Sequence, residues 1–198
     1  MANSITVGST LSTTWTRKDP NAYTTYTFLL ETTLISQSVA NNTSTIKVKL
    51  SMKTNYDNTT AFSGGNWATF YTYIASNGGS YGQLGYKALG EFTGSTSYVE
   101  LISTNYDLTH NSDGTATYSV KGKNVRGSNQ NYQPQDGEGE ITNISLPTIA
   151  RFPKIWVHNG STWKLGTVYV HNGSTWKQAQ EVYIHNGTTW KATTDRGS

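Results

Sequence analysis

Three copies of one short segment carry the residues whose types could recognise a ligand. The copies read IWVHNGSTWK, VYVHNGSTWK and VYIHNGTTWK, and they occupy residues 155–164, 168–177 and 182–191. An aromatic ring can stack on the apolar face of a sugar ring, while a neighbouring imidazole or hydroxyl binds the sugar's hydroxyl groups. Three copies would also combine weak sites through avidity, which can exceed the affinity of one site by factors of about 10² to 10⁴.

The candidate carbohydrate-binding residues are the aromatic and histidine positions of these copies. They are Trp156, His158, Trp163, Tyr169, His171, Trp176, Tyr183, His185 and Trp190. An alternative interpretation assigns the same rings to packing, because aromatic residues are usually buried and cross-strand aromatic pairs stabilise small sheets. In that case the copies would mediate oligomerisation or dock on a neighbouring subunit.

The Asn-Gly pair in each copy predicts a β-hairpin with a two-residue type I′ turn. In the first copy this register places His158 opposite Ser161 and Val157 opposite Thr162. The aromatic residues would pair across the strands, as Trp156 with Trp163, Tyr169 with Trp176 and Tyr183 with Trp190. Each hairpin would then have an aromatic face and an aliphatic face, and the three aliphatic faces could pack together.

The three repeat histidines occupy equivalent positions, and three imidazoles around a pseudo-three-fold axis could bind zinc. A histidine before Asn-Gly is more often a polar residue that flanks the turn. The sequence also supplies no nearby carboxylate to orient the imidazoles of His158, His171 and His185. We therefore expect no metal site.

The sequence offers little for catalysis. Asp136, Glu138 and Glu140 alternate along DGEGE. Glycoside hydrolases use a pair of such carboxylates for catalysis. This segment is rich in glycine, and its pattern is typical of the solvent-exposed beginning of a β-strand. The sequence has no cysteine, no Gly-x-Ser-x-Gly elbow, no phosphate-binding loop and no His-Glu-x-x-His helix. We expect a non-enzymatic protein without catalytic residues or a cofactor.

The sequence of the first 150 residues predicts the β-strands of the domain that carries the three copies. Residues 45–52 read TIKVKLSM, whose strict alternation predicts a half-buried strand. Asn111 to Gly114 form a turn signal, and His110 is expected to cap that turn. About seven or eight strands separated by Gly, Asn and Ser clusters predict an all-β chain with an antiparallel Ig-like or jelly-roll-type sandwich. Three short β-hairpin repeats would follow the sandwich.

A boundary is expected where LPTIARFPK brings two prolines close together, because proline resists both a helix and a central strand. This divides the chain into a sandwich over residues 1–151 and hairpin repeats over residues 152–198. The net charge of +3 comes from scattered basic residues, so we expect no nucleic-acid partner. No apolar run of 18 residues and no signal-peptide pattern is present, so we expect no membrane partner.

Three stretches of the sandwich region resemble a known family. They are SQSVANNTSTIKVKL (36–50), LTHNSDGTATYSV (108–120) and ISLPTIAR (144–151). Together they are similar to an Ig-like β-sandwich domain in structural proteins of long-tailed bacteriophages, the siphophages, that infect Gram-positive bacteria. The closing motif of that family is L-P-T-I-P-R, and Ala150 replaces its second proline here. The C-terminal copies resemble short aromatic repeats that end phage tail and fibre proteins.

This resemblance implies a virion protein of the tail, the fibre or the decorated particle surface, without known catalysis. It implies contacts with other virion proteins, and it supplies no ligand residues. Combined with the aromatic copies, it suggests a host cell-wall or surface polysaccharide as partner. A homo-oligomer, such as a trimer, is the expectation under the purely structural alternative, in which the protein decorates the capsid or tail.

Overall fold

The structure is a computed structural model that describes residues 3–57, 61–127, 132–149, 154–179, 182–185 and 187–192. These residues form β-strands and no α-helix, which confirms the all-β prediction. No helix that could cross a membrane occurs in these ranges. The chain divides into two compact units, Met1–Thr148 and Ile149–Ser198.

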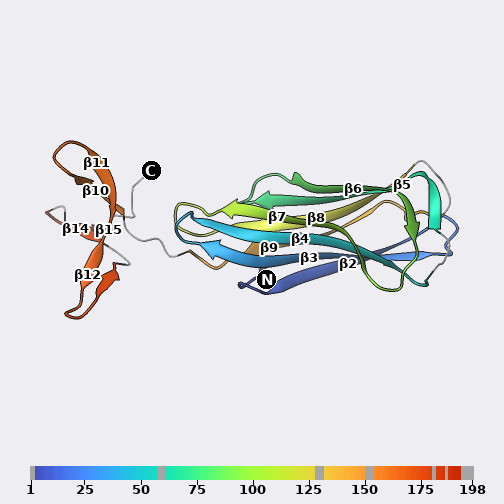
Figure 1. Cartoon of the computed structure of the whole chain (residues 1–198), viewed down its shortest axis with the longest axis horizontal. Helices are drawn as coiled ribbons and strands as arrows, with labels where there is room; N and C mark the ends of the chain where they lie inside the picture. The colour runs from blue at the N-terminus through green and yellow to red at the C-terminus, as the bar shows by residue number, and fades with distance from the viewer. Residues whose placement is uncertain are drawn as a thin grey trace. The chain divides into compact units, whose positions relative to one another are not determined.

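The first unit is a sandwich of two sheets, as predicted (Figure 1). The four-stranded sheet has the order β2 (Thr10–Lys18), β3 (Thr25–Ser38), β4 (Thr43–Thr54) and β7 (Val99–Thr109). The five-stranded sheet has the order β1 (Asn3–Ser4), β9 (Gly137–Ser145), β8 (Thr117–Arg126), β5 (Ala61–Ser76) and β6 (Gly82–Thr93). The pairing of β1 with β9 is parallel, and the other described pairings are antiparallel.

The core forms where the alternating apolar residues of the two sheets face each other. The predicted strand over residues 45–52 is confirmed, because Ile46, Val48, Leu50 and Met52 are fully buried while Lys47 and Lys49 face outward. Each such aliphatic side chain contributes roughly 1.5–3 kcal/mol of transfer free energy when it leaves water. A core of this size gives the unit its own source of stability.

Aromatic side chains fill the space between the sheets. Trp67 contacts Tyr26 with ring centroids 5.8 Å apart and Phe92 with centroids 5.5 Å apart. Trp15 stacks on Phe28 at 5.0 Å, and its indole N–H donates a hydrogen bond of 3.0 Å to Asn124 Oδ1. This bond satisfies the polar end of a buried indole, so that the ring can pack without a desolvation cost.

His110 fixes the turn between β7 and β8 from inside the protein. The Gly114 carbonyl can only accept, so His110 Nδ1–H donates to it across 2.7 Å. Nε2 then accepts a 2.7 Å hydrogen bond from the Ser44 hydroxyl. Ser44 and His110 are both buried. The expected role of His110 at this turn is therefore seen, and it also joins the turn to β4.

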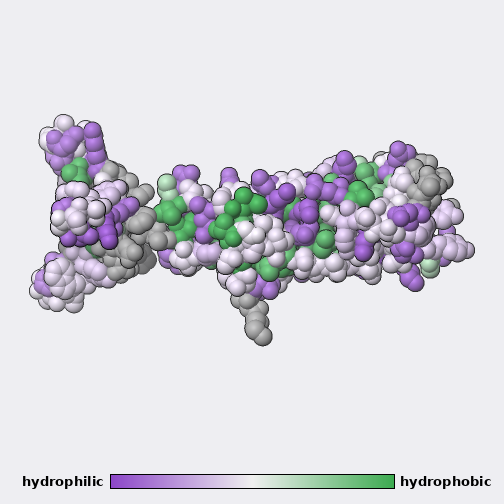
Figure 2. Space-filling model, turned by 60° about the horizontal axis from the view of Figure 1, so that its bottom comes forward, coloured by the Kyte–Doolittle hydropathy of each residue, from purple (hydrophilic) through white to green (hydrophobic). Residues whose placement is uncertain are grey.

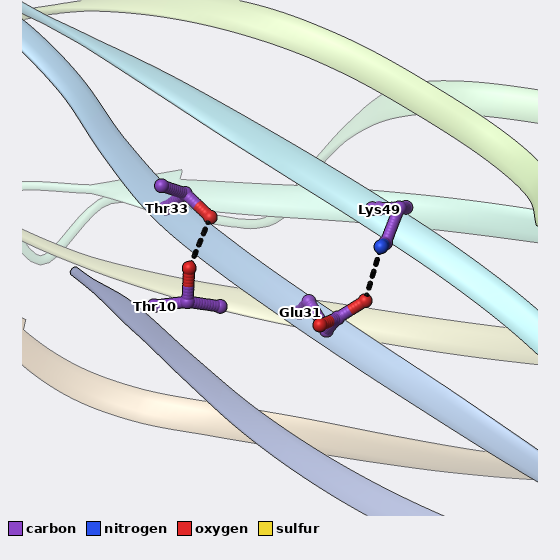
Figure 3. A network of polar contacts seen from close by, with 4 residues as sticks. All are labelled: Thr10, Glu31, Thr33 and Lys49. Atoms are coloured by element: carbon purple, nitrogen blue, oxygen red, sulfur yellow. Dashed lines mark hydrogen bonds and ion pairs between the residues drawn. The ribbon is translucent and has the colours of Figure 1, made fainter. Parts of the chain in front are cut away.

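Polar side-chain contacts link neighbouring strands of the four-stranded sheet (Figure 3). The Glu31 carboxylate pairs with the Lys49 ammonium at 2.6 Å, and the hydroxyls of Thr10 and Thr33 share a hydrogen bond of 2.7 Å. Both contacts link neighbouring strands on the solvent side. Cross-strand pairs of this kind contribute roughly 0.2–1 kcal/mol each.

The second unit consists of three two-stranded antiparallel sheets, so the three predicted hairpins are present (Figure 1). They are β10 (Lys154–His158) with β11 (Trp163–Thr167), β12 (Tyr169–His171) with β13 (Trp176–Gln178), and β14 (Tyr183–His185) with β15 (Trp190–Ala192). Among the described residues, each of these strands pairs only with the other strand of its own hairpin.

Candidate functional site

The loop of each hairpin decides which side chains meet across the strands. In the first hairpin His158 pairs with Trp163, so the loop holds the four residues from Asn159 to Thr162. The predicted two-residue type I′ turn is therefore wrong. Gly160 has a φ of 99°, whereas the φ of Asn159 is not positive. A type I′ turn requires positive φ at both positions.

The Asn159 side chain explains the longer loop. Its Oδ1 accepts hydrogen bonds from the backbone N–H groups of Ser161 at 3.1 Å and Thr162 at 2.9 Å. The Asn159 N–H donates to the Thr162 carbonyl at 3.1 Å. Asn172 makes the same three contacts in the second loop, whereas Asn186 of the third loop lies outside the described residues. An asparagine side chain that substitutes for a backbone acceptor removes the need for a tight turn.

The longer loop changes the predicted pairs but not the predicted faces. Trp156 pairs with Leu165, Tyr169 with Gln178 and Tyr183 with Ala192, so the expected direct aromatic pairs are wrong. The expected pairs of His158 with Ser161 and Val157 with Thr162 are wrong for the same reason. A shift by two residues preserves the side-chain alternation. The aromatic and histidine positions of one hairpin therefore still share a face.

Each tryptophan of the second strand faces the histidine of the first strand. The ring centroids are 5.0 Å apart for His158 and Trp163, 5.0 Å for His171 and Trp176, and 4.9 Å for His185 and Trp190. The ring planes are tilted by 58°, 51° and 54° in the same order. The three hairpins thus repeat one arrangement of an imidazole beside an indole.

The indoles are exposed rather than packed within the chain. Trp163, Trp176 and Trp190 keep 65%, 69% and 69% of their surface exposed. Tyr169 and Tyr183 are about half exposed on the same faces, whereas the side chain of Trp156 lies outside the described residues. These three tryptophans are therefore not buried within their own hairpins.

The aliphatic faces are exposed as well. Val157 and Val170 lie opposite Lys164 and Lys177, and both valines are exposed. The side chain of Ile184 lies outside the described residues. The expected packing of the aliphatic faces on one another is thus not seen for these two valines. In Figure 2 the visible described surface of this unit is mostly white to purple, with small green areas.

The polar contacts near each histidine come from its own loop. The backbone N–H of Gly160 donates to His158 Nδ1 at 3.3 Å, and Gly173 and Gly187 make the same contact with His171 and His185 at 3.3 Å. The described residues contain no group of three His, Cys, Asp or Glu side chains placed to hold a metal ion.

The acidic residues of DGEGE have partners in the sandwich. Asp136 Oδ1 accepts a hydrogen bond from the Arg126 N–H at 2.7 Å. Glu138 lies 3.9 Å from the Lys121 ammonium, and Glu140 accepts a hydrogen bond of 3.0 Å from the Tyr81 hydroxyl. Burial and the bond to Glu140 raise the pKa of the Tyr81 hydroxyl. These three carboxylates serve separate strand contacts.

A second group of surface aromatics lies on the sandwich and was not predicted from the sequence. Tyr71 lies 5.4 Å from Tyr86 and 6.0 Å from Tyr73, measured between ring centroids, and Tyr86 is exposed. The alternation of tyrosine in YTY at residues 71–73 places both rings on one face of β5. That alternation was the signal that could have identified them.

A family model matches residues 18–197 of the chain, and its description is "Siphovirus protein of unknown function (DUF859)". The matched range includes most of the sandwich and all three hairpins. No curated protein and no solved structure matches the chain.

Proposed function

The chain belongs to this siphovirus protein family, and from that premise we propose that it is a structural protein of the virion, in the tail, a fibre or a surface decoration. Its three C-terminal hairpins bind glycan on the host surface. The observation that carries this proposal is the exposure of Trp163, Trp176 and Trp190, each beside a histidine in the same geometry.

The exposure of these indoles favours a binding role over a packing role. Burial of a large apolar side chain contributes favourable transfer free energy, and an exposed tryptophan does not make this contribution to folding. Single exposed apolar residues are common on protein surfaces, whereas here the same large ring is left exposed in each of the three copies. An indole with a polar neighbour is suited to a sugar, whose ring offers apolar C–H groups and hydroxyls.

The repetition of the hairpin supports multivalent recognition of a polymer. A single indole with one adjacent donor offers a small contact area and therefore weak binding. Host-surface polysaccharides present the same sugar unit many times, so three sites on one chain can engage one polymer together. Further copies of the chain on a virion would multiply this effect.

The sandwich supports the proposal through its strand order. The order β9-β8-β5-β6 corresponds to strands G, F, C and C′ of an immunoglobulin-type sandwich, and the neighbours β4 and β7 correspond to B and E. Trp67 is buried in β5 at the position of strand C, where such domains carry a buried tryptophan. The inter-sheet disulfide of antibody domains has no counterpart, since the chain has no cysteine. We therefore propose an Ig-like domain as the structural module.

A second candidate function is assembly. Val157 and Val170 are exposed on the opposite faces of their hairpins, and such faces could bind another virion protein or a second copy of this chain. Sedimentation equilibrium of the full chain tests self-assembly, because binding to a second copy requires a concentration-dependent oligomer, whereas glycan binding requires none.

A glycan array of bacterial wall polysaccharides, probed with the full chain, tests the binding role. The matched variants are Trp163→Ala, Trp176→Ala and Trp190→Ala combined, and Tyr86→Ala as control. Tyr86 is an exposed aromatic residue of the sandwich, so its removal reports non-specific adhesion of aromatic surface. The proposal expects the triple variant to lose its signals and Tyr86→Ala to keep them. Equal signals in the triple variant would exclude the hairpins as the binding site.

A further inference from the structure

We infer that each repeat histidine donates a hydrogen bond through Nε2–H to an acceptor oxygen of the glycan that stacks on the neighbouring tryptophan. This inference rests on the proposed function and specifies the chemistry of its site. It assigns the histidine, rather than the loop hydroxyls, as the polar group that orients the sugar.

The loop determines which imidazole nitrogen carries the proton. A backbone N–H can only donate, and the Gly160 N–H points at His158 Nδ1 from 3.3 Å. Nδ1 must therefore be the unprotonated nitrogen of the neutral ring, and Nε2 must carry the hydrogen. The same contact at the same distance in the other two loops assigns the same tautomer to His171 and His185.

The Nε2–H groups have no partner within the described residues. In the described ranges, the imidazole hydrogen bonds of these histidines run only to the loop glycines, and each histidine is exposed. The ring of each histidine is about 5 Å from its tryptophan, which is within the span of one pyranose ring. A free donor thus lies beside an exposed apolar ring in all three hairpins.

The loop hydroxyls are engaged elsewhere. The Ser161 and Thr162 hydroxyls lie 3.3 Å and 3.4 Å from Asn159 Oδ1, and they donate to that oxygen. The Ser174 and Thr175 hydroxyls donate to Asn172 Oδ1 in the same way. These hydroxyls therefore stabilise the loop, and the imidazole remains as the polar group beside the indole.

This arrangement selects the chemistry of the ligand. A sugar that stacks on the indole must present an oxygen with a free lone pair toward the imidazole, such as a hydroxyl, a ring oxygen or an amide carbonyl. A group that can only donate, such as an ammonium, would leave both donors unpaired in a partly desolvated contact. We therefore assign the ligand to neutral or acidic sugars with an acceptor at this position.

Two sets of triple substitutions in the full chain test the role of Nε2–H. Glutamine in place of His158, His171 and His185 keeps an amide N–H close to the position of Nε2. Asparagine offers an oxygen near the position of Nδ1, which can still accept from the loop glycine, but places nothing at Nε2. The loss of one hydrogen bond per site should weaken binding to purified host cell walls by about tenfold or more in the asparagine variant. The glutamine variant should stay within about threefold of wild type.

The tautomer can be measured without any ligand. Long-range ¹H–¹⁵N correlation spectra of the full chain distinguish Nε2–H from Nδ1–H, and His110 is an internal reference. His110 donates through Nδ1–H to the Gly114 carbonyl, so its pattern should be opposite to that of the three repeat histidines. An Nδ1–H pattern in the repeat histidines would overturn the inference.

The outcomes separate this inference from the proposed function. If the triple tryptophan variant loses wall binding while the asparagine and glutamine variants both bind like wild type, the histidine role is refuted and the binding site stands. Equal weakening of the asparagine and glutamine variants also refutes a donor at Nε2. If the triple tryptophan variant binds like wild type, the proposed function fails and the histidine role fails with it. Support requires the Nε2–H tautomer together with selective weakening of the asparagine variant.

Discussion

His171 and Trp176 lie directly opposite each other in the second hairpin, with ring centroids 5.0 Å apart. The four-residue loop creates this pair, because a two-residue turn would have placed Tyr169 opposite Trp176. One side of the indole is partly covered by the imidazole, while most of its surface remains open to solvent. The loop therefore determines both the composition and the exposure of the candidate site.

Replacing Asn172 by glycine distinguishes the observed loop from a type I′ turn. A type I′ turn tolerates Gly-Gly, whereas the observed loop would lose the Oδ1 acceptor of Ser174 and Thr175 N–H. We expect Asn172→Gly to destabilise the second hairpin by about 1 kcal/mol or more, measured by amide chemical shifts and hydrogen exchange. Asn172→Asp keeps the acceptor and should resemble wild type. A fully folded hairpin in the glycine variant would contradict the loop assignment.

Replacing Gly173 by valine tests the loop backbone. Gly173 has a φ of 99°, and no heavy atom lies within 4 Å of the position that a Cβ atom would occupy. The cost must therefore come from the backbone conformation, at roughly 1–3 kcal/mol for a β-branched residue. Gly173→Asn should cost less, because asparagine tolerates positive φ better. In NOE spectra we expect the cross-strand contacts between His171 and Trp176 to disappear in Gly173→Val. They should remain in Gly173→Asn.

A methyl group added at Gly122 should disturb the core of the sandwich. A Cβ atom there would lie 2.8 Å from Trp15 Cη2, which real Cβ contacts essentially never show. The indole would have to move, and with it the hydrogen bond to Asn124. We expect Gly122→Ala to lower the free energy of unfolding by about 1–3 kcal/mol in urea titrations. Gly90→Ala, which meets no atom within 4 Å, is the matched control and should change it little.

The sandwich should lose stability at alkaline pH. Burial raises the pKa of the Tyr118 hydroxyl to about 12, although its hydrogen bond with Thr32 lowers it. In the unfolded chain a tyrosine titrates near pH ~10, so above that pH the unfolded state releases a proton that the folded state retains. The contribution is therefore fully present below about pH 10 and is lost as the pH rises toward 12, by about 3 kcal/mol in total.

Urea titrations between pH 8 and about pH 11 measure this loss. Tyr118→Phe removes the titrating hydroxyl and should flatten the decline. Part of the decline should remain, because burial also raises the pKa of Tyr26. An equally steep decline in wild type and Tyr118→Phe would show that Tyr118 is not linked to folding in this range.

Local patterns in the sequence predicted those parts of the fold that depend on local interactions. The alternation from Ile46 to Met52 predicted a strand because one sheet face is buried, and the Asn-Gly pairs predicted hairpins. The length of the loops was not predicted, because the Asn159 side chain competes with the backbone for the same N–H groups. This competition moved the tryptophan opposite the histidine.

Contacts between residues far apart in the chain could not be read from the sequence. Trp15 rests on Gly122, and Tyr118 shares a hydrogen bond with Thr32, although neither pair forms a local pattern. The sequence also did not decide whether Trp163 is exposed, because tryptophan occurs both in packed cores and in binding sites. The structure decided that the ring is exposed on its own hairpin.

Co-sedimentation of the full chain with purified host cell walls tests the central claim most directly. The comparison is between wild type and the variant in which Trp163, Trp176 and Trp190 are replaced by alanine. The indoles are exposed, so their removal leaves no internal cavity, and the thermal melting of the sandwich and the hairpin signals should change little. We predict that the wild-type chain sediments with the walls and that the variant stays in the supernatant. Equal sedimentation of the two proteins would contradict it, as would a hairpin unit that unfolds when the indoles are removed.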